Sequence, residues 1–290
     1  PLSLRFLKRD ETLKIRLLKK DGQRRKIAIV YFGLLRSLKD VYERHSKHIF
    51  RVLQDNDVDY KIFMHTWKTK GDVQRVWYSS DGYEKQDYSQ YKVLNPYKYK
   101  IDSQEEFQNT LELKNYWKEG EWDKRLLQNH LCAVESQKRG LKMVLEDNDS
   151  FDHVMFVRPD ANFEKDFPID ALEFLESRNN GILIPNHDNY EGYNDRFAVT
   201  NMSHAKFYAN RIDEYPAFRE NGNGRIVAEK LIKYIVKKYF SYKGIRFPFK
   251  FKRPPKKKTQ LLLKDNPKWC FHIVTYPPHF KYVDALIQSL

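Results

Sequence analysis

The sequence contains only two cysteines, Cys132 and Cys270, among 290 residues. Two cysteines provide no disulfide framework, and without a Cys-x-x-Cys pair they indicate no zinc site of the usual spacing. No apolar run is long enough to span a membrane, and no secretory signal is recognisable. So few cysteines are typical of a reducing compartment. We therefore expect a cytoplasmic protein.

Two glycine-rich signatures are also missing. The chain has no Gly-x-Gly-x-x-Gly and no Walker Gly-x-x-x-x-Gly-Lys, so neither a dinucleotide-binding fold nor a P-loop is indicated. Acidic residues are absent from residues 237–258, which carry ten lysines and arginines. The whole chain has 53 Lys and Arg against 39 Asp and Glu, a net charge of +14. This charge indicates an anionic partner, either nucleic acid, a phosphate-bearing small molecule or a membrane surface.

The apolar pattern predicts an α/β fold, with a Rossmann-type mixed sheet flanked by helices. The chain length fits one large domain of this kind, and β-α-β spacing at the start favours parallel strands. We expect a basic extension at 1–25 and one domain at 26–290, with a nucleotide-binding half (26–165) and an acceptor-binding half (166–290). Residues 68–123 are polar, aromatic and irregular. Strands are expected at 26–32, 58–64, 154–157, 182–185 and 197–199. Helices are expected at 38–53 and 124–146, and the stretch 222–239 is expected to end in an amphipathic helix.

The most informative stretch is 152–163, where a buried strand ends at Pro159 and polar residues follow. Ligands of open α/β sheets bind at such strand ends. Asp160 and Asn162 alternate, so their oxygens face one side if the chain stays extended. Such a pair suits a hard divalent cation that holds a diphosphate. A polar turn with a surface pair between Arg158 and Asp160 is the simpler alternative.

The first two strands end in residues that suit a phosphate or a base. Gly33 permits a tight turn and close approach of a ligand, Arg36 adds a charge, and Ser37 is placed to cap the next helix. The second strand ends at His65 and Trp67, which we expect at the same sheet edge. Trp67 either stacks on a base or sugar or closes the core.

Four short motifs occur in a fixed order between residues 26 and 210. The first two motifs lie at the ends of the first two expected strands. The third follows the strand at 154–157, and the fourth runs into the strand at 197–199. They are Gly33-Leu34-Leu35-Arg36, Phe63-Met64-His65-Thr66-Trp67, Arg158-Pro159-Asp160-Ala161-Asn162-Phe163 and Asn194-Asp195-Arg196-Phe197-Ala198.

With these motifs the chain resembles nucleotide-sugar glycosyltransferases of the GT-A type. Within them it is similar to a group from bacteria and large DNA viruses of algae that includes xylosyltransferases. The resemblance implies transfer of a sugar, with xylose as the first choice, from a UDP-sugar to a glycan acceptor. The transfer is expected to be inverting and metal-assisted. A viral origin would put the protein in the host cytoplasm, without a stable nucleic-acid partner, and peripheral membrane contact stays open.

The resemblance also implies roles for particular residues. Asp160 and Asn162, with His272 as a later ligand, would hold Mn²⁺ or Mg²⁺. The nucleotide-sugar site would comprise Gly33, Arg36, His65, Trp67, Arg158 and Asp160. The base that deprotonates the acceptor is either Asp195, from its polar loop, or Glu229, from its place in the order of motifs. A carboxylate at Glu229 also suits the start of a helix without any catalytic role.

Two other classes of function fit parts of the pattern. A metal-dependent phosphoryl transferase or nuclease also needs acid-bound metal beside basic residues, although more clustered acids are usual there. A non-enzymatic module for nucleic acid or polysaccharide would use the basic residues of 237–258.

Overall fold

A computed structural model describes residues 24–75, 83–116, 123–220 and 227–252. The chain divides into two compact units, residues 1–255 and 256–290, and every described residue belongs to the first. His272, expected to complete a metal site, and the part of the basic tract from residue 253 onward therefore lie outside the described residues.

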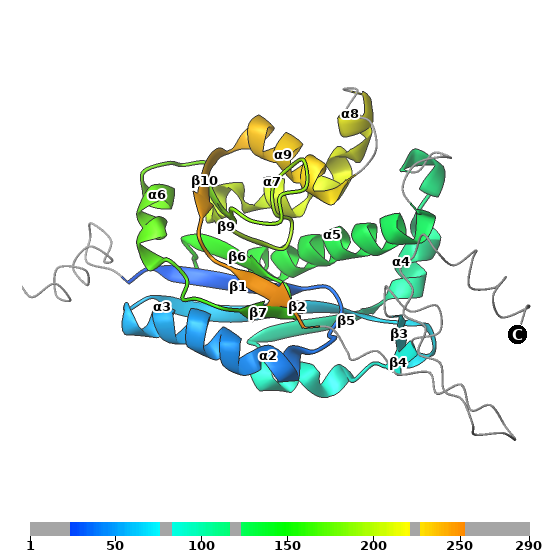
Figure 1. The fold of residues 1–290 in the computed structure, drawn as a ribbon, viewed down its shortest axis with the longest axis horizontal. Coiled ribbons are helices and arrows are strands. Elements are labelled where there is room, and N and C mark those ends of the chain that lie inside the picture. Colours follow the sequence, from blue (N-terminus) through cyan, green and yellow to red (C-terminus); the bar gives the residue numbers. More distant parts are fainter. Residues whose placement is uncertain (1–23, 76–82, 117–122, 221–226, 253–290) are drawn as a thin grey trace, which may run out of the picture. The chain divides into compact units, whose positions relative to one another are not determined.

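The core of the first unit is a seven-stranded sheet in the order β10-β8-β9-β6-β1-β2-β5 (Figure 1). Only β9 runs antiparallel to its neighbours, so the sheet is mixed. This confirms the predicted α/β class and the parallel pairing of the first two strands. The strands are β1 (Lys26–Phe32), β2 (Asp59–Lys68), β5 (Lys98–Ser103), β6 (His153–Val157), β8 (Gly181–Pro185), β9 (Phe197–Asn201) and β10 (Ser241–Ile245).

The central strands are apolar throughout because both faces of the sheet are covered. Alternate residues of β1 enter different core clusters: Ile29 packs in one and Val30 in the other, both fully buried. The helices α2 and α3 lie on one face and α5 on the other (Figure 1). The α-helices are α2 (Leu38–His45), α3 (Arg51–Asp55), α4 (Gln104–Thr110), α5 (Lys124–Leu145), α6 (Leu172–Glu176), α7 (Ala205–Ala209), α8 (Tyr215–Glu220) and α9 (Ala228–Tyr239).

Two of the predicted helices are found almost at their expected bounds. The helix expected at 38–53 is a continuous helical stretch with a π-helical segment, Ser46–Phe50, between α2 and α3. Asp123 caps α5, since its carboxylate accepts the backbone N–H groups of Arg125 and Leu126. Single-turn 3₁₀ segments cover Lys70–Asp72, Leu113–Asn115, Ile169–Ala171, Met202–His204 and Arg211–Glu214, and a longer one covers Tyr88–Leu94.

Two regions hold more regular structure than the sequence pattern predicted. The stretch 68–123, expected to be irregular, contains β3 (Val73–Arg75), β4 (Tyr83–Lys85), α4 and β5. The basic tract contains β10 and a short strand, β11 (Phe249–Phe251), that pairs antiparallel with β7 (Ala161–Phe163). β5 and β10 are the two edge strands of the main sheet. An edge strand exposes more of its surface and so tolerates polar residues, which hides it from an apolar pattern.

Candidate functional site

The site lies where the strand order of the sheet reverses. From β1 the chain continues to β2 on one side, and it later returns to β6 on the other side. Because β1 and β6 are parallel neighbours, the residues after Phe32 and after Val157 meet at one edge. Such a switch point at the carboxyl ends of the strands is where open α/β sheets bind ligands.

Asp160 is held by two arginines at this edge. Arg158 donates from Nε to Oδ1 at 3.0 Å and from Nη2 to Oδ2 at 2.9 Å, a bidentate pair. Arg36 Nη1 lies 3.9 Å from Oδ2. The carboxylate is 1% exposed, whereas Arg36 and Arg158 are 22% and 24% exposed. The buried acid therefore holds the Arg158 guanidinium by two hydrogen bonds and lies within ion-pair distance of Arg36. Both arginines still reach the surface, where guanidinium groups suit an anion.

The same contacts decide whether the described residues fit a divalent cation. Both oxygens of Asp160 accept N–H groups from Arg158, and a cation there would meet two guanidinium charges. Asn162 lies in β7 opposite Lys250. Within the described part of the chain, no three His, Cys, Asp or Glu side chains are grouped to hold a metal ion. These residues do not fit the predicted metal, so we derive no step through one.

The turn after β1 is shaped by Gly33, whose φ is +93°. An added Cβ would meet nothing within 4 Å, so the backbone conformation is what requires glycine. Its N–H donates to Ser136 Oγ at 2.8 Å. Ser37 stands at the expected N-cap position, but its hydroxyl caps no helix N–H. It donates instead to the carbonyl of Lys252 at 2.6 Å, which ties the last described residue to this turn.

His65 and Trp67 are buried between β2 and α5. His65 lies 2.8 Å from Ser136 Oγ and 3.2 Å from Asp102 Oδ2, and burial lowers its pKa to about 4. Trp67 donates from Nε1 to the carbonyl of Cys132 at 2.9 Å. Ser136 also accepts from Gly33, so His65 supports the turn through a shared hydroxyl. The hydrogen bonds of these two side chains run to Ser136, Asp102 and Cys132, and their part in a nucleotide site stays a prediction.

A second charged cluster occupies the same edge. Arg196, just before β9, lies 2.9 Å from Asp188 Oδ2, 3.5 Å from Asp195 Oδ1 and 3.7 Å from Glu229 Oε1. Three carboxylates therefore surround one guanidinium. Burial, and next the charge of Asp195, raise the pKa of Glu229 to about 7. A carboxyl group with this pKa exchanges a proton near neutral pH, as a general base requires.

The loop between β8 and β9 holds these groups in an unusual backbone conformation. Asp188, Tyr190 and Glu191 all have positive φ, at 53°, 27° and 69°. Non-glycine residues in this region are strained and concentrate at functional sites. Asn194 compensates: its amide donates to the carbonyl of His187 at 3.0 Å, and its Oδ1 accepts the N–H of Arg196 at 2.9 Å.

The same loop packs on the start of α9. The N–H of Tyr193 donates to the carbonyl of Glu229 at 3.0 Å. At Gly192 an added Cβ would collide with that carbonyl, so glycine is needed for the close approach. The position of the Glu229 backbone is therefore set by the loop that carries Asp195 and Arg196.

Phe251 joins the two clusters. The guanidinium carbon of Arg158 lies 4.4 Å from its ring centre and that of Arg196 lies 5.2 Å away. The ring is positioned by the pairing of β11 with β7, and Lys252 N donates to the carbonyl of Asp160 at 3.0 Å. Asp188, Arg196 and Phe251 were not among the predicted site residues. Arg196 stood inside the motif 194–198, and Phe251 in the alternating aromatics of the basic tract.

Comparison with known proteins adds a faint likeness of fold. No protein-family profile matches the chain, and no curated protein matches it in sequence. The solved structures similar to it include mouse xyloside xylosyltransferase 1 in its apo form. That likeness has a TM-score of 0.40 and 8% identity, over 76% of this chain and 84% of that one. Similarity at this level carries no conclusion about activity.

Proposed function

We propose that this chain is a GT-A-like glycosyltransferase that moves a sugar from a UDP-sugar to a glycan acceptor with inversion, with xylose as the first candidate. One observation carries the proposal. Arg36 and Arg158 lie beside Asp160 at the switch point and both reach the surface. The Phe251 ring separates Arg158 from Arg196, whose carboxylate cluster contains Glu229. An anion site beside a near-neutral carboxyl group matches what such a transfer needs.

The arginine pair serves the donor. As the sugar departs, negative charge accumulates on the UDP diphosphate, and fixed positive groups lower the barrier by stabilising that charge. Arg36 and Arg158 supply them, and guanidinium groups suit phosphate oxygens through paired N–H donors. Asp160 acts as a positioning residue, because its carboxylate orients both arginines.

The carboxylate cluster serves the acceptor. Glu229 takes the proton of the acceptor hydroxyl while that oxygen forms its bond to the anomeric carbon. The bond from this carbon to the β-phosphate oxygen breaks, and UDP leaves with the electron pair. Of the two predicted bases, Glu229 is preferred because its pKa of about 7 suits the task. Asp195 contributes by raising that pKa, and Arg196 limits the rise.

Other predicted residues support these two groups. Gly33, with His65 behind it through Ser136, sets the turn that carries Arg36. Trp67 fixes β2 against α5. The predicted Mn²⁺ or Mg²⁺ would draw on Asp160, Asn162 and His272, and in our proposal the arginines neutralise the diphosphate without it.

Donor hydrolysis across a panel of sugar nucleotides tests the proposal. We expect release of UDP plus free sugar from a UDP-sugar, with UDP-xylose foremost, and a loss of at least about tenfold in Arg158→Ala. Arg178→Ala removes an exposed arginine away from the site and is the matched control. Release of UMP plus sugar phosphate would instead favour a phosphoryl transferase. Thermal stabilisation by DNA or RNA alone, without any donor turnover, would favour a binding module.

A further inference from the structure

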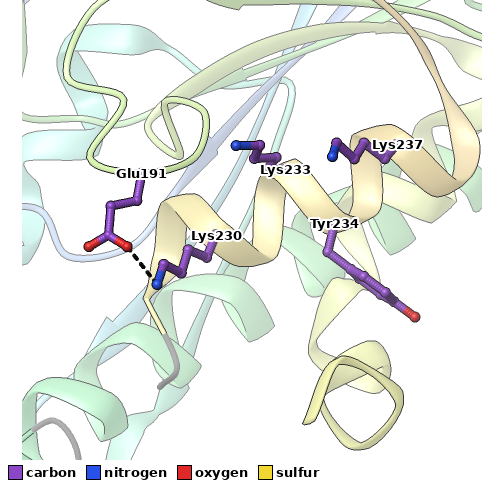
Figure 2. Close-up of a pocket in the computed structure, with 5 residues that line it drawn as sticks. All are labelled: Glu191, Lys230, Lys233, Tyr234 and Lys237. Carbon is purple, nitrogen blue, oxygen red and sulfur yellow. Dashed lines mark ion pairs between the residues drawn. The ribbon is translucent and has the colours of Figure 1, made fainter. Parts of the chain in front are cut away.

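A lysine-lined pocket lies along α9, next to the carboxylate cluster. It has a volume of about 350 Å³ and is lined by Glu191, Lys230, Lys233, Tyr234 and Lys237 (Figure 2). Lys230 Nζ forms an ion pair with Glu191 Oε2 at 2.6 Å. Within the described parts of the chain neither Lys233 nor Lys237 has an ion-pair partner, and both reach solvent. Of the three pocket lysines, Lys230 is thus paired with an acid that lines the pocket, whereas Lys233 and Lys237 have no such partner among the described residues.

The lysines continue a row that begins at Glu229. Residues four apart lie on the same helix face, so Glu229, Lys233 and Lys237 follow one another along α9, about 6 Å apart in rise. Figure 2 shows the ammonium groups of Lys233 and Lys237 extending to the same side from successive turns. Glu191, across the pocket, belongs to the loop that also carries Asp195 and Arg196. Glu229 therefore lies about one helical turn before Lys233 on α9, although it does not itself line the pocket.

We infer that the acceptor is an anionic glycan. A carboxylate or sulfate on the acceptor binds Lys233 and Lys237, while a hydroxyl group nearer the start of α9 reaches Glu229. This inference rests on the proposed function, since it names the substrate class of the same site. A nucleic acid fits less well, because its binding usually engages many phosphates and this row offers two lysines, whereas one or two anionic groups on a sugar match Lys233 and Lys237.

Isothermal titration of the full chain with oligosaccharides of equal length provides the test. The probes are an oligogalacturonide, its fully methyl-esterified form, a sulfated xylo-oligosaccharide and an unmodified xylo-oligosaccharide. We expect a carboxylated or sulfated probe to bind at least tenfold more tightly than its neutral counterpart. The double variant Lys233→Glu, Lys237→Glu should lose at least tenfold of that affinity. The double variant Lys47→Glu, Lys165→Glu has the same charge change elsewhere and should keep it.

Three results would overturn the inference. The first is equal binding of charged and neutral probes, and the second is wild-type affinity in the Lys233, Lys237 double variant. The third is that single-stranded DNA binds more tightly than every oligosaccharide and loses this binding in the same variant. Circular dichroism of each variant confirms folding. Donor hydrolysis by the wild-type chain alone is measured in parallel. If it is absent while the charged probes still bind through these lysines, the proposed transfer fails and the anionic-glycan site stands.

Discussion

The guanidinium of Arg196 lies 3.7 Å from the carboxylate of Glu229, although the two residues belong to different elements and are brought together by a loop packed on a helix. Burial and Asp195 raise the pKa of Glu229 to about 7, and Arg196 opposes that rise. The balance places the proton exchange of this group near neutral pH.

The rate of transfer should therefore depend on pH through Glu229. A base acts when deprotonated, so kcat/KM should rise with pH and level off above an apparent pKa near 7. Glu229→Gln should lose about 10²–10⁴-fold in rate and abolish this rise. Initial rates between pH 5 and 9 provide the measurement. A wild-type profile that is flat over this range would remove Glu229 from the role of base.

The same group predicts a stability change with pH. Its pKa is raised in the folded protein from the ordinary value of 4.5. Its stability contribution is therefore fully present below about pH 4.5 and is lost as the pH rises through about 7. Relative to Glu229→Gln, the wild-type free energy of unfolding should fall between pH 5 and pH 8. Urea denaturation of both proteins at the two pH values measures it, and a constant difference would contradict the raised pKa.

Replacing Asp160 should release both arginines at the switch point. We expect Asp160→Asn to lower the rate by about 10²–10³-fold and to weaken UDP binding, because Arg36 and Arg158 lose their fixed orientation. The unfolding free energy should fall by about 1–3 kcal/mol, since charged hydrogen bonds are lost. Asp170→Asn, at an exposed position, is the control for stability and binding. Wild-type turnover in Asp160→Asn would exclude this role.

Removal of divalent metal separates the arginine mechanism from the metal predicted by the motif. With the diphosphate neutralised by arginines, we expect EDTA to change UDP affinity by less than about threefold, whereas Arg36→Ala should cost about tenfold or more. Calorimetry with UDP, in EDTA and in Mn²⁺, gives both values. If EDTA greatly weakened UDP binding and Mn²⁺ restored it, Asp160 would be a metal ligand after all, and residues outside the described part would complete the site.

Gly192→Ala should impair catalysis without removing any polar group. The new methyl group would collide with the Glu229 carbonyl and push the loop away from α9. Such overpacking typically costs about 1–3 kcal/mol. With the loop displaced, Glu229 gains solvent and moves away from Asp195, so the apparent pKa of the pH profile should fall below 7. An unchanged profile in a folded variant would show that the contact does not position the base.

The sequence predicted the central strands well, because burial on both faces leaves a continuous apolar run. The strand expected at 26–32 is β1 without any shift, and the helix expected at 124–146 is α5 but for one residue. The edge strands β5 and β10 were not predicted, because each has few buried side chains and so lacks an apolar run. The apolar pattern also could not predict that β9 runs antiparallel, because strand direction depends on pairing partners far away in the chain.

The candidate site was predicted in part. Strand ends pointed to Arg36, Arg158 and Asp160 because parallel strands deliver their carboxyl ends to one edge. The pair between Arg158 and Asp160 was the simpler of the two alternatives at this stretch. Spacing could not choose between it and a cation, because the choice depends on side-chain directions. Phe251 was not predicted either, because it is placed at the site by the pairing of β11 with β7, and β11 follows β7 by about ninety residues in the chain.

That late strand has a consequence for how the protein matures during synthesis. All seven strands of the main sheet have left the ribosome's active centre by residue 245, yet the ring shared by Arg158 and Arg196 and the tether from Ser37 to Lys252 come only afterwards. The strands of the main sheet are therefore all synthesised before the aromatic ring that joins the two charged clusters. The proposed site would therefore be assembled only once β11 has paired with β7, whereas the main sheet needs no residue beyond Ile245.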